Sequence, residues 1–249
     1  MSRSTDSKSE ILKGIEIIDL ALYLKEEKVL LLADLHIGYE DALVKQGVLV
    51  PKFHFKELVE RVEGIFEIIL KSKRKVDTIV INGDLKHEFG RISDEEWRNT
   101  LKMLDYLARK CKRIVLVRGN HDTVLGPIAD KRKILVVDNF LAGDKMIMHG
   151  DRIQDVPAPV KTIVIGHDHP AVGIQDGIRR EVYKCFLVGK YNGKNLVVMP
   201  SMSPATEGTD VKKENLLSPY LKGDIGNFKA YVVADEVYDF GKIRRIKHG

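Results

Sequence analysis

The sequence of 249 residues has only two cysteines, Cys111 and Cys185, which lie 74 positions apart and form no CxxC pair. A disulfide framework or a zinc ribbon needs several cysteines at short, regular spacings. The cysteine content therefore excludes both, and we expect two buried thiols in a reducing compartment.

Long apolar runs are also missing. No stretch approaches the roughly 20 apolar residues that a membrane-spanning helix needs, and the N-terminal MSRSTDSKSE lacks the apolar core of a secretory signal. We therefore expect a cytoplasmic protein without a membrane span.

The charge is nearly balanced, with 41 basic and 36 acidic residues and a formal net charge of +5. This excess alone does not establish nucleic-acid binding.

The composition is that of a folded globular chain, with 44% hydrophobic and 31% charged residues. Its length suits one α/β domain with a substantial core. We expect a single domain over residues 1–249, with a flexible tail at residues 1–10. Residues 201–228 contain Gly, Pro, Ser and Thr with little periodicity, which predicts a long surface loop.

Strand-like runs alternate with helices in the first half and follow one another in the second. The apolar residues from Phe55 to Ile69 have the spacing of one helix face, and the capping box Ser93–Glu96 predicts the start of another helix. The strand-like runs cover residues 14–24, 28–34, 76–83, 113–120, 133–137, 145–150, 162–169, 181–189, 195–200, 229–235 and 242–246. This order predicts an α/β fold in which two sheets form a β-sandwich flanked by helices, with layers α/β/β/α.

Five short polar clusters each follow a strand-like run. They are Asp34-Leu35-His36, Gly83-Asp84, Gly119-Asn120-His121-Asp122, His149-Gly150 and Gly166-His167-Asp168-His169. Because polar residues at the carboxyl ends of strands converge at one edge of a sheet, we expect these clusters to meet. In the last cluster the two histidines alternate and share a side, so Asp168 is expected to point away.

The clusters supply enough ligands for a pair of metal ions. The candidate ligands are Asp34, His36, Asp84, Asn120, His149, His167 and His169. Two divalent ions need about four protein ligands each when one ligand is shared. Imidazole and carboxylate together favour manganese, iron or zinc over calcium. DxH, GD and HG alone are weak signals, GNHD and GHxH are moderately specific, and the ordered set is strongly specific.

The order DxH, GD, GNHD, HG, GHxH resembles the signature of the calcineurin-like metallophosphoesterase superfamily. Within it, the phrases ADLHIGYE, INGDLKHEFG and IGHDHPA resemble archaeal SbcD-related and bacterial ligase-associated phosphoesterases. The resemblance implies one metal held by Asp34, His36 and His169 and a second held by Asn120, His149 and His167. It also implies that Asp84 bridges the two metals and that His121 protonates the leaving group or contacts the phosphate.

The expected activity is hydrolysis of a phosphodiester or phosphomonoester, with nucleic acids and nucleotides as candidate substrates. Two divalent ions, manganese first, held about 3.5–4 Å apart would activate a bridging hydroxide. Asp122 is expected to orient His121 or to pin its loop. Arg118 and Arg152 flank proposed ligands and are candidates for phosphate contact. His87 either lines the site or is simply exposed.

Two alternatives belong to other classes of protein. One is a non-catalytic metal-binding scaffold, and the other is a nucleic-acid-binding accessory protein with a vestigial site. A scaffold has no physical need for a general acid. His121 together with all seven ligands therefore favours the enzyme.

Overall fold

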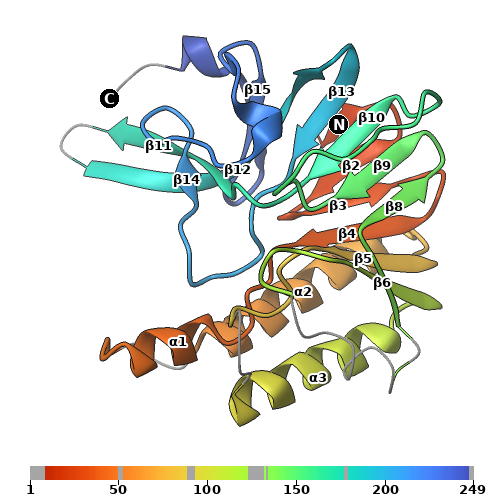
Figure 1. The fold of residues 1–249 in the computed structure, drawn as a ribbon, viewed down its shortest axis with the longest axis vertical. Helices are drawn as coiled ribbons and strands as arrows, with labels where there is room; N and C mark the ends of the chain where they lie inside the picture. The colour runs from red at the N-terminus through yellow and green to blue at the C-terminus, as the bar shows by residue number, and fades with distance from the viewer. Residues whose placement is uncertain are drawn as a thin grey trace, which may run out of the picture.

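The computed structural model describes residues 9–49, 53–88, 93–122, 132, 134–176 and 179–246. Two β-sheets pack face to face, and helices cover the outer face of the first sheet (Figure 1). Of the expected N-terminal tail, residues 1–8 lie outside the described part of the chain, and a strand already begins at Glu10.

The first sheet has strand order β1-β2-β3-β4-β5-β6-β7. Its strands are β1 (Glu10–Leu12), β2 (Ile15–Ile18), β3 (Ala21–Leu24), β4 (Val29–Ala33), β5 (Thr78–Asn82), β6 (Arg113–Val117) and β7 (Leu135–Val137). Strands β1 to β4 are antiparallel, and β4 to β7 are parallel.

Two strand predictions need correction in this sheet. Residues 14–24 form two strands instead of one, because Asp19 adopts a left-handed backbone with φ 52° and turns the chain between β2 and β3. Residues 133–137 were expected in the second sheet, but β7 pairs in parallel with β6 and extends the first.

The described part of the chain has three α-helices: α1 (Tyr39–Lys45), α2 (His54–Lys71) and α3 (Asp94–Ala108). Helices α2 and α3 cover the first sheet, whereas α1 projects to one side (Figure 1). The apolar face predicted for α2 is confirmed, and Leu58, Val62 and Ile65 are buried against the sheet. At the start of α3, Ser93 Oγ accepts a hydrogen bond from the Glu96 backbone N–H at 3.0 Å. The Glu96 carboxylate accepts instead from the N–H groups of His87 and Glu88, both at 3.0 Å, and so ties α3 to the loop after β5.

The second sheet has strand order β14-β11-β12-β13-β10-β9-β8, with β15 beside β12 and β16 beside β15. Its strands are β8 (Asn139–Ala142), β9 (Lys145–Met148), β10 (Thr162–Ile165), β11 (Pro170–Asp176), β12 (Arg179–Tyr191), β13 (Lys194–Val198), β14 (Thr209–Asp210), β15 (Lys229–Val233) and β16 (Val237–Lys242). The strand expected at residues 242–246 is wrong beyond Lys242. Ile243–Arg245 form a 3-10 turn that inserts buried Ile243 and exposes the two arginines.

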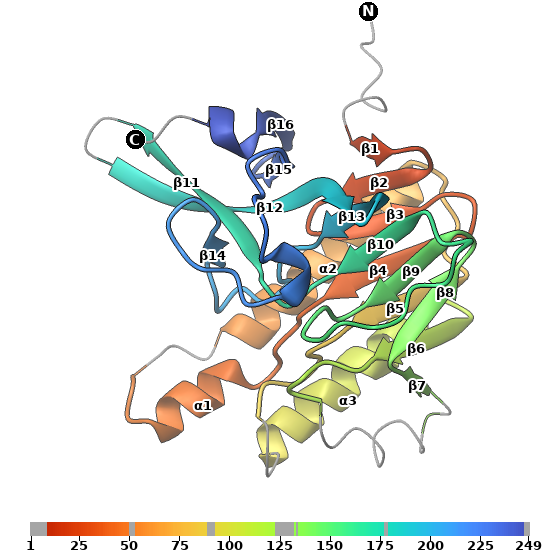
Figure 2. The same cartoon turned by 45° about the horizontal axis from the view of Figure 1, so that its top comes forward.

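Three apolar layers hold the sheets and helices together. Leu30 and Leu32 of β4 face the helices, whereas Leu31 faces the second sheet, as the alternation of a strand requires. A third layer lies on the outer face of the second sheet, where Tyr220 and Leu221 pack. In Figure 2, β9 and β10 of the second sheet lie above β5 and β6 of the first, and α3 lies below them.

The two-sheet sandwich is confirmed, but its fourth layer differs from the expected helices. The outer face of the second sheet is covered by the segment of residues 201–228, which contains β14 and a 3-10 turn (Pro219–Leu221). The described part of the chain has no α-helix after α3. None of the described helices combines the length and the apolar character needed to cross a membrane.

Candidate metal centre

The five polar clusters lie at the carboxyl ends of β4, β5, β6, β9 and β10. Strands β4, β5 and β6 run parallel to one another, and so do β9 and β10. The ends of neighbouring parallel strands therefore open onto the same edge of each sheet, and the candidate ligands of both sheets meet there.

The first group of donors consists of Asp34, His36 and His169. The Nε2 atoms of His36 and His169 are 3.2 Å apart, and His169 Nε2 lies 3.7 Å from Asp34 Oδ2. We call these three residues the first donor group.

The second donor group consists of Asp84, His149 and His167. His167 Nδ1 lies 3.1 Å from His149 Nε2. Asn120 joins this group, because its Oδ1 lies 2.9 Å from the same His149 nitrogen.

Asp84 lies between the two groups. Its Oδ2 atom is 3.8 Å from His36 Nε2 in the first group and 3.4 Å from His149 Nε2 in the second. The structure thus brings together all seven residues that the sequence nominated as ligands, with the carboxylate nominated as the bridge in the middle.

Backbone strain is concentrated at these residues. Nine described non-glycine residues have positive φ, and five of the nine are candidate ligands. The five are Asp34 (φ 52°), His36 (45°), Asp84 (41°), His167 (70°) and His169 (47°). Left-handed backbone costs about 1–3 kcal/mol per residue and persists only where the surroundings enforce it. Its concentration here is typical of a functional site.

At three positions in the polar clusters, a side chain from another strand lies so close to the backbone that only glycine fits. A Cβ atom at Gly83 would lie within 3.0 Å of the His149 ring, and one at Gly119 within 3.0 Å of the Asp84 carboxylate. A Cβ atom at Gly166 would come as close to the Asp34 carboxylate. The glycine in each motif therefore lets a strand end pass directly against a ligand from another strand.

Burial sets the protonation of the donors. It raises the pKa of Asp34 well above its usual range, and the nearby Asp84 carboxylate adds to the rise. Burial also raises the pKa of Asp84 to about 8 and lowers that of His169 to about 3. The pKa values of His36 and His149 are likewise well below the ordinary range because burial disfavours the imidazolium.

These donors fit divalent cations. Ring nitrogens of neutral histidines approach one another at 3.1–3.2 Å, and Asp34 Oδ1 accepts no hydrogen bond from the described residues. Ligands about 2.1 Å from a single ion are typically about 3–3.5 Å apart. The spacing within each donor group is close to that of ligands sharing one ion, and the mixed oxygen and nitrogen set suits manganese, iron or zinc.

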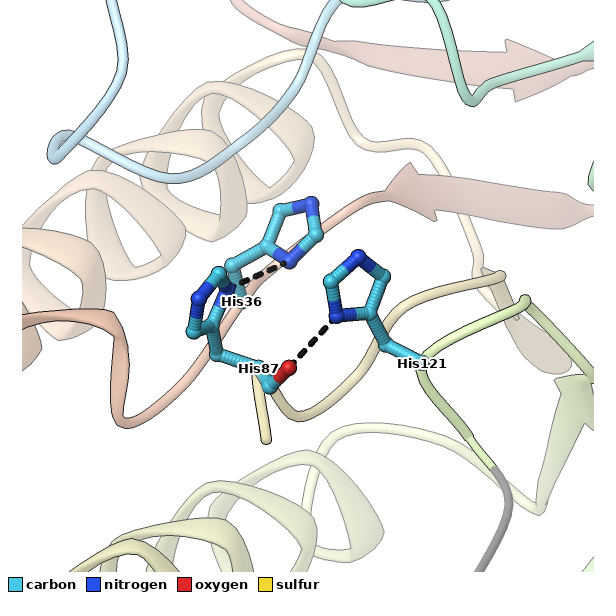
Figure 3. A group of neighbouring side chains, drawn as sticks. All are labelled: His36, His87 and His121. Carbon is cyan, nitrogen blue, oxygen red and sulfur yellow. Dashed lines mark hydrogen bonds between the residues drawn. The ribbon is translucent and has the colours of Figure 1, made fainter. Parts of the chain in front are cut away.

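His87 and His121 form a third cluster with His36 (Figure 3). The Nδ1 atoms of His36 and His87 face each other at 3.4 Å. His121 Nδ1 donates to the His87 backbone carbonyl at 2.5 Å, and His121 Nε2 lies 3.9 Å from Asp84 Oδ2. The position of His87 matches the first of its two possibilities, that it lines the site, and not that it is simply exposed.

Asp122 and Lys86 tie the loops after β5 and β6 together. The buried Asp122 carboxylate accepts hydrogen bonds from the backbone N–H groups of Gly119 and Leu85, both at 3.1 Å. The fully buried Lys86 ammonium donates to the carbonyl oxygens of Glu88 and of His121. Through these contacts, Asp122 and Lys86 connect the loop that carries His121 to the loop after β5.

The remaining candidates lie further out. Arg118 and Arg152 both pair with Asp138, at 3.2 and 3.1 Å, and are about half exposed. Their part in phosphate contact remains a prediction. Asp168 points away from the donors, as expected, and accepts from the backbone N–H groups of Leu217 and Ser218.

A cavity of about 200 Å³ opens beside the first donor group. It is lined by the candidate ligands His36 and His169 and by Tyr39, His87, His121, Ser203 and Thr206. Sequence reasoning did not nominate Tyr39, Ser203 or Thr206, because isolated hydroxyl-bearing residues form no recognisable motif. Lys86 was missed for a different reason: lysine is almost never fully buried, so its type gives no signal.

Comparisons with known proteins agree with this geometry. A family model described as calcineurin-like phosphoesterase matches residues 27–167, more than half of the chain. The structure of Pseudomonas putida nuclease MPE superposes with a TM-score of 0.63 at 18% identity, covering 91% of this chain and 94% of that one. No curated protein sequence matches the chain.

Two further solved structures are more distant. Zinc-bound Vps29 from Entamoeba histolytica has a TM-score of 0.34 at 15% identity, over 86% of this chain and 99% of that one. A predicted phosphoesterase from Streptococcus pneumoniae has a TM-score of 0.31 at 17% identity, over 86% and 97% of the two chains. At 18% identity the nuclease structure bears on the fold alone, and the other two structures carry no argument.

The close approach at Gly119 gives a first testable prediction. The Gly119→Ala substitution would push its methyl group into Asp84, so we expect divalent-metal affinity to fall by about 10-fold or more. Gly64→Ala is a matched control, because nothing lies within 4 Å of that position in α2, and alanine favours the helix by about 1 kcal/mol. Calorimetric metal titration of both variants checks this. Equal affinities in the two variants would refute the steric argument.

The pKa of Asp84 gives a second prediction. Without a bound metal, burial raises the pKa of Asp84 in the folded protein to about 8, from an ordinary value of 3.8. Between these values the unfolded chain has lost the proton while the folded protein keeps it, so rising pH destabilises the fold. The Asp84→Asn variant lacks this titration. Wild-type stability relative to that variant should therefore decline from about pH 4 to pH 8 in denaturant unfolding. A difference that does not change with pH would contradict the assignment.

Proposed function

The chain belongs to the calcineurin-like phosphoesterase family, a family of metal-dependent hydrolases of phosphoester bonds, and we propose that this member hydrolyses phosphodiesters with two divalent metal ions. The observation that carries the proposal is the position of Asp84. Its Oδ2 atom lies within 4 Å of a histidine nitrogen from each donor group, which is the place of a ligand shared by two ions.

In this proposal the first donor group holds one ion and the second donor group with Asn120 holds the other, while Asp84 contributes to both. Manganese is the first choice, with iron or zinc as alternatives. When bound, the ions would supply a water acidic enough to attack near neutral pH and would neutralise phosphate charge. The protein's own residues then have to orient the ester and manage the proton of the leaving group.

His87 is proposed to orient His36. If His36 Nε2 binds the metal, its proton is on Nδ1, which faces His87 Nδ1 at 3.4 Å. His87 Nδ1 then accepts that proton in a hydrogen bond, which fixes the tautomer and the ring plane of His36. The ring proton of His87 is then on Nε2, where it can donate a hydrogen bond to an ester bound in the cavity.

His121 is proposed to protonate the leaving oxygen. Its Nδ1–H is held by the His87 carbonyl, so the ring presents Nε2 toward the centre. Burial lowers the pKa of His121, while the hydrogen bond to His87 raises it. A bound phosphate ester brings negative charge beside Nε2 and favours the imidazolium, whose proton can then pass to the departing alkoxide.

The cavity favours a diester over a monoester. Its described lining includes neutral histidines, hydroxyl groups and Tyr39 but neither lysine nor arginine. A phosphomonoester carries about −1.5 to −2 charges at pH 7, whereas a diester carries one. The diester therefore needs less positive charge beyond the metals. The resemblance to SbcD-related enzymes and the fold shared with a protein described as a nuclease support nucleic acid as the diester, by analogy.

The proposed function is tested by stripping the protein with a chelator, restoring Mn²⁺ and comparing three substrates. We expect metal-dependent hydrolysis of bis-p-nitrophenyl phosphate and of labelled DNA, and slower hydrolysis of p-nitrophenyl phosphate. Metal binding without turnover of any substrate would instead indicate a scaffold. Salt-sensitive DNA binding without hydrolysis would indicate an accessory protein.

The role of His121 gives a separate prediction. The His121→Ala variant should keep both metals but lose about 10²–10⁴-fold in kcat on substrates with poor leaving groups. The loss should be smaller for p-nitrophenyl esters, whose leaving group needs no proton. His54→Ala, a change at the start of α2, serves as the control. Loss of metal from the His121 variant would show that this histidine is a ligand and not an acid.

A further inference from the structure

Lys184 is a partly buried cation of β12 that the proposed mechanism does not use. Its ammonium group donates to the backbone carbonyl oxygens of Ser201, at 2.9 Å, and of Ser203. Burial lowers the pKa of Lys184 to about 7, although the carboxylates of Asp19 and Asp34 oppose the shift. A charge in such a position is costly unless it is hydrogen-bonded, and the two carbonyl groups meet that need.

The segment Ser201–Ser203, which we call the strap, crosses from the second sheet to the first. It is the beginning of the region expected to be a surface loop, yet its three residues are only 0%, 0% and 2% exposed. The Met202 N–H donates to the Ala33 carbonyl at 2.9 Å, which places the strap alongside the end of β4.

The strap is hydrogen-bonded to the backbone carbonyl of Asp34. Ser201 Oγ donates to the Asp34 carbonyl at 2.6 Å, and the Ser203 N–H donates to the same oxygen at 3.3 Å. Asp34 has a left-handed backbone with φ 52°, a conformation that relaxes unless its neighbours hold it. The direction of the Asp34 carboxylate therefore depends on where the strap lies, together with the His167 backbone N–H, which donates to Asp34 Oδ2 at 3.0 Å.

Lys184 determines where the strap lies. The carbonyl groups of Ser201 and Ser203 are buried in the strap and need a donor, and the ammonium of Lys184 binds both at once. Without that ammonium, both carbonyl groups would lose a partner, and the strap would shift towards water.

We propose that Lys184 is a positioning residue for the first donor group, acting through the Ser201–Ser203 strap on the carboxylate of Asp34. This inference rests on the proposed two-metal function. Because Asp34 belongs to the first donor group and not to the second, loosening the strap should weaken one metal site and spare the other. General destabilisation of the fold would weaken both sites together.

The experiment is a calorimetric titration of Mn²⁺ into the full chain after chelator treatment. In Lys184→Met and Ser201→Ala we expect the Kd of one binding step to rise about 10–100-fold while the other changes by less than roughly threefold. Lys184→Gln, whose amide can still donate to one carbonyl, should fall between Lys184→Met and wild type. Lys190→Met is the matched control, since Lys190 lies on the same strand but is exposed and binds only Asn195 Oδ1 among the contacts resolved for it.

Each outcome decides the inference. Unchanged binding in Lys184→Met and Ser201→Ala, or equal weakening of both steps, would overturn it. If circular dichroism shows that Lys184→Met does not fold, Ser201→Ala decides alone, because that variant keeps the lysine and both carbonyl groups. A wild-type protein that binds no Mn²⁺ would overturn the proposed function itself, which is a different result from normal wild-type binding with unaffected variants.

Discussion

Two buried carboxylates and four histidines lie within a few ångströms of one another in this protein. Burying these polar groups together costs free energy, and the rest of the structure has to offset that cost. Without a cation between them, the carboxylates are driven towards the protonated form, and burial keeps the histidines neutral although their ring nitrogens lie 3.1–3.2 Å apart. In the proposed function, a pair of divalent ions would reverse both penalties, since each ion would attract the carboxylates and accept nitrogen lone pairs.

The rest of the fold holds the donors in place against that cost. The two sheets each bring parallel strand ends to the same edge, and glycines there let the chains approach closely enough for the ligands to meet. Left-handed backbone at the ligands stores strain that the surrounding contacts must balance. Asp122, Lys86 and the strap are those contacts, and each of them links segments far apart in the sequence.

Much of this could be predicted from the sequence, because the ligands occur in short motifs that directly follow strands. The sandwich, helix α2 and the cap at Ser93 follow from local periodicity and capping chemistry. What local patterns could not predict is pairing over long range. The assignment of β7 to the first sheet depends on its partner β6, and a run of four apolar residues, 134–137, does not identify its neighbour.

The same limit applies to the site. Nothing near Ser201 or Lys184 in the sequence indicates that Ser201 binds the backbone of Asp34 or that Lys184 binds the Ser201 carbonyl, since these contacts span 167 and 17 positions of the chain. Arg118 and Arg152 were nominated from their positions beside ligands, yet both turn to Asp138, a residue with no motif of its own. Sequence proximity to a ligand thus identifies a neighbourhood but does not give the direction of a side chain.

Anomalous diffraction from manganese-loaded crystals would show whether two cations share Asp84. We predict two peaks at the manganese edge, one in each donor group, with the Asp84 carboxylate between them and about 3.5–4 Å separating them. A single peak, or peaks that leave Asp84 out of contact with either ion, would contradict this prediction.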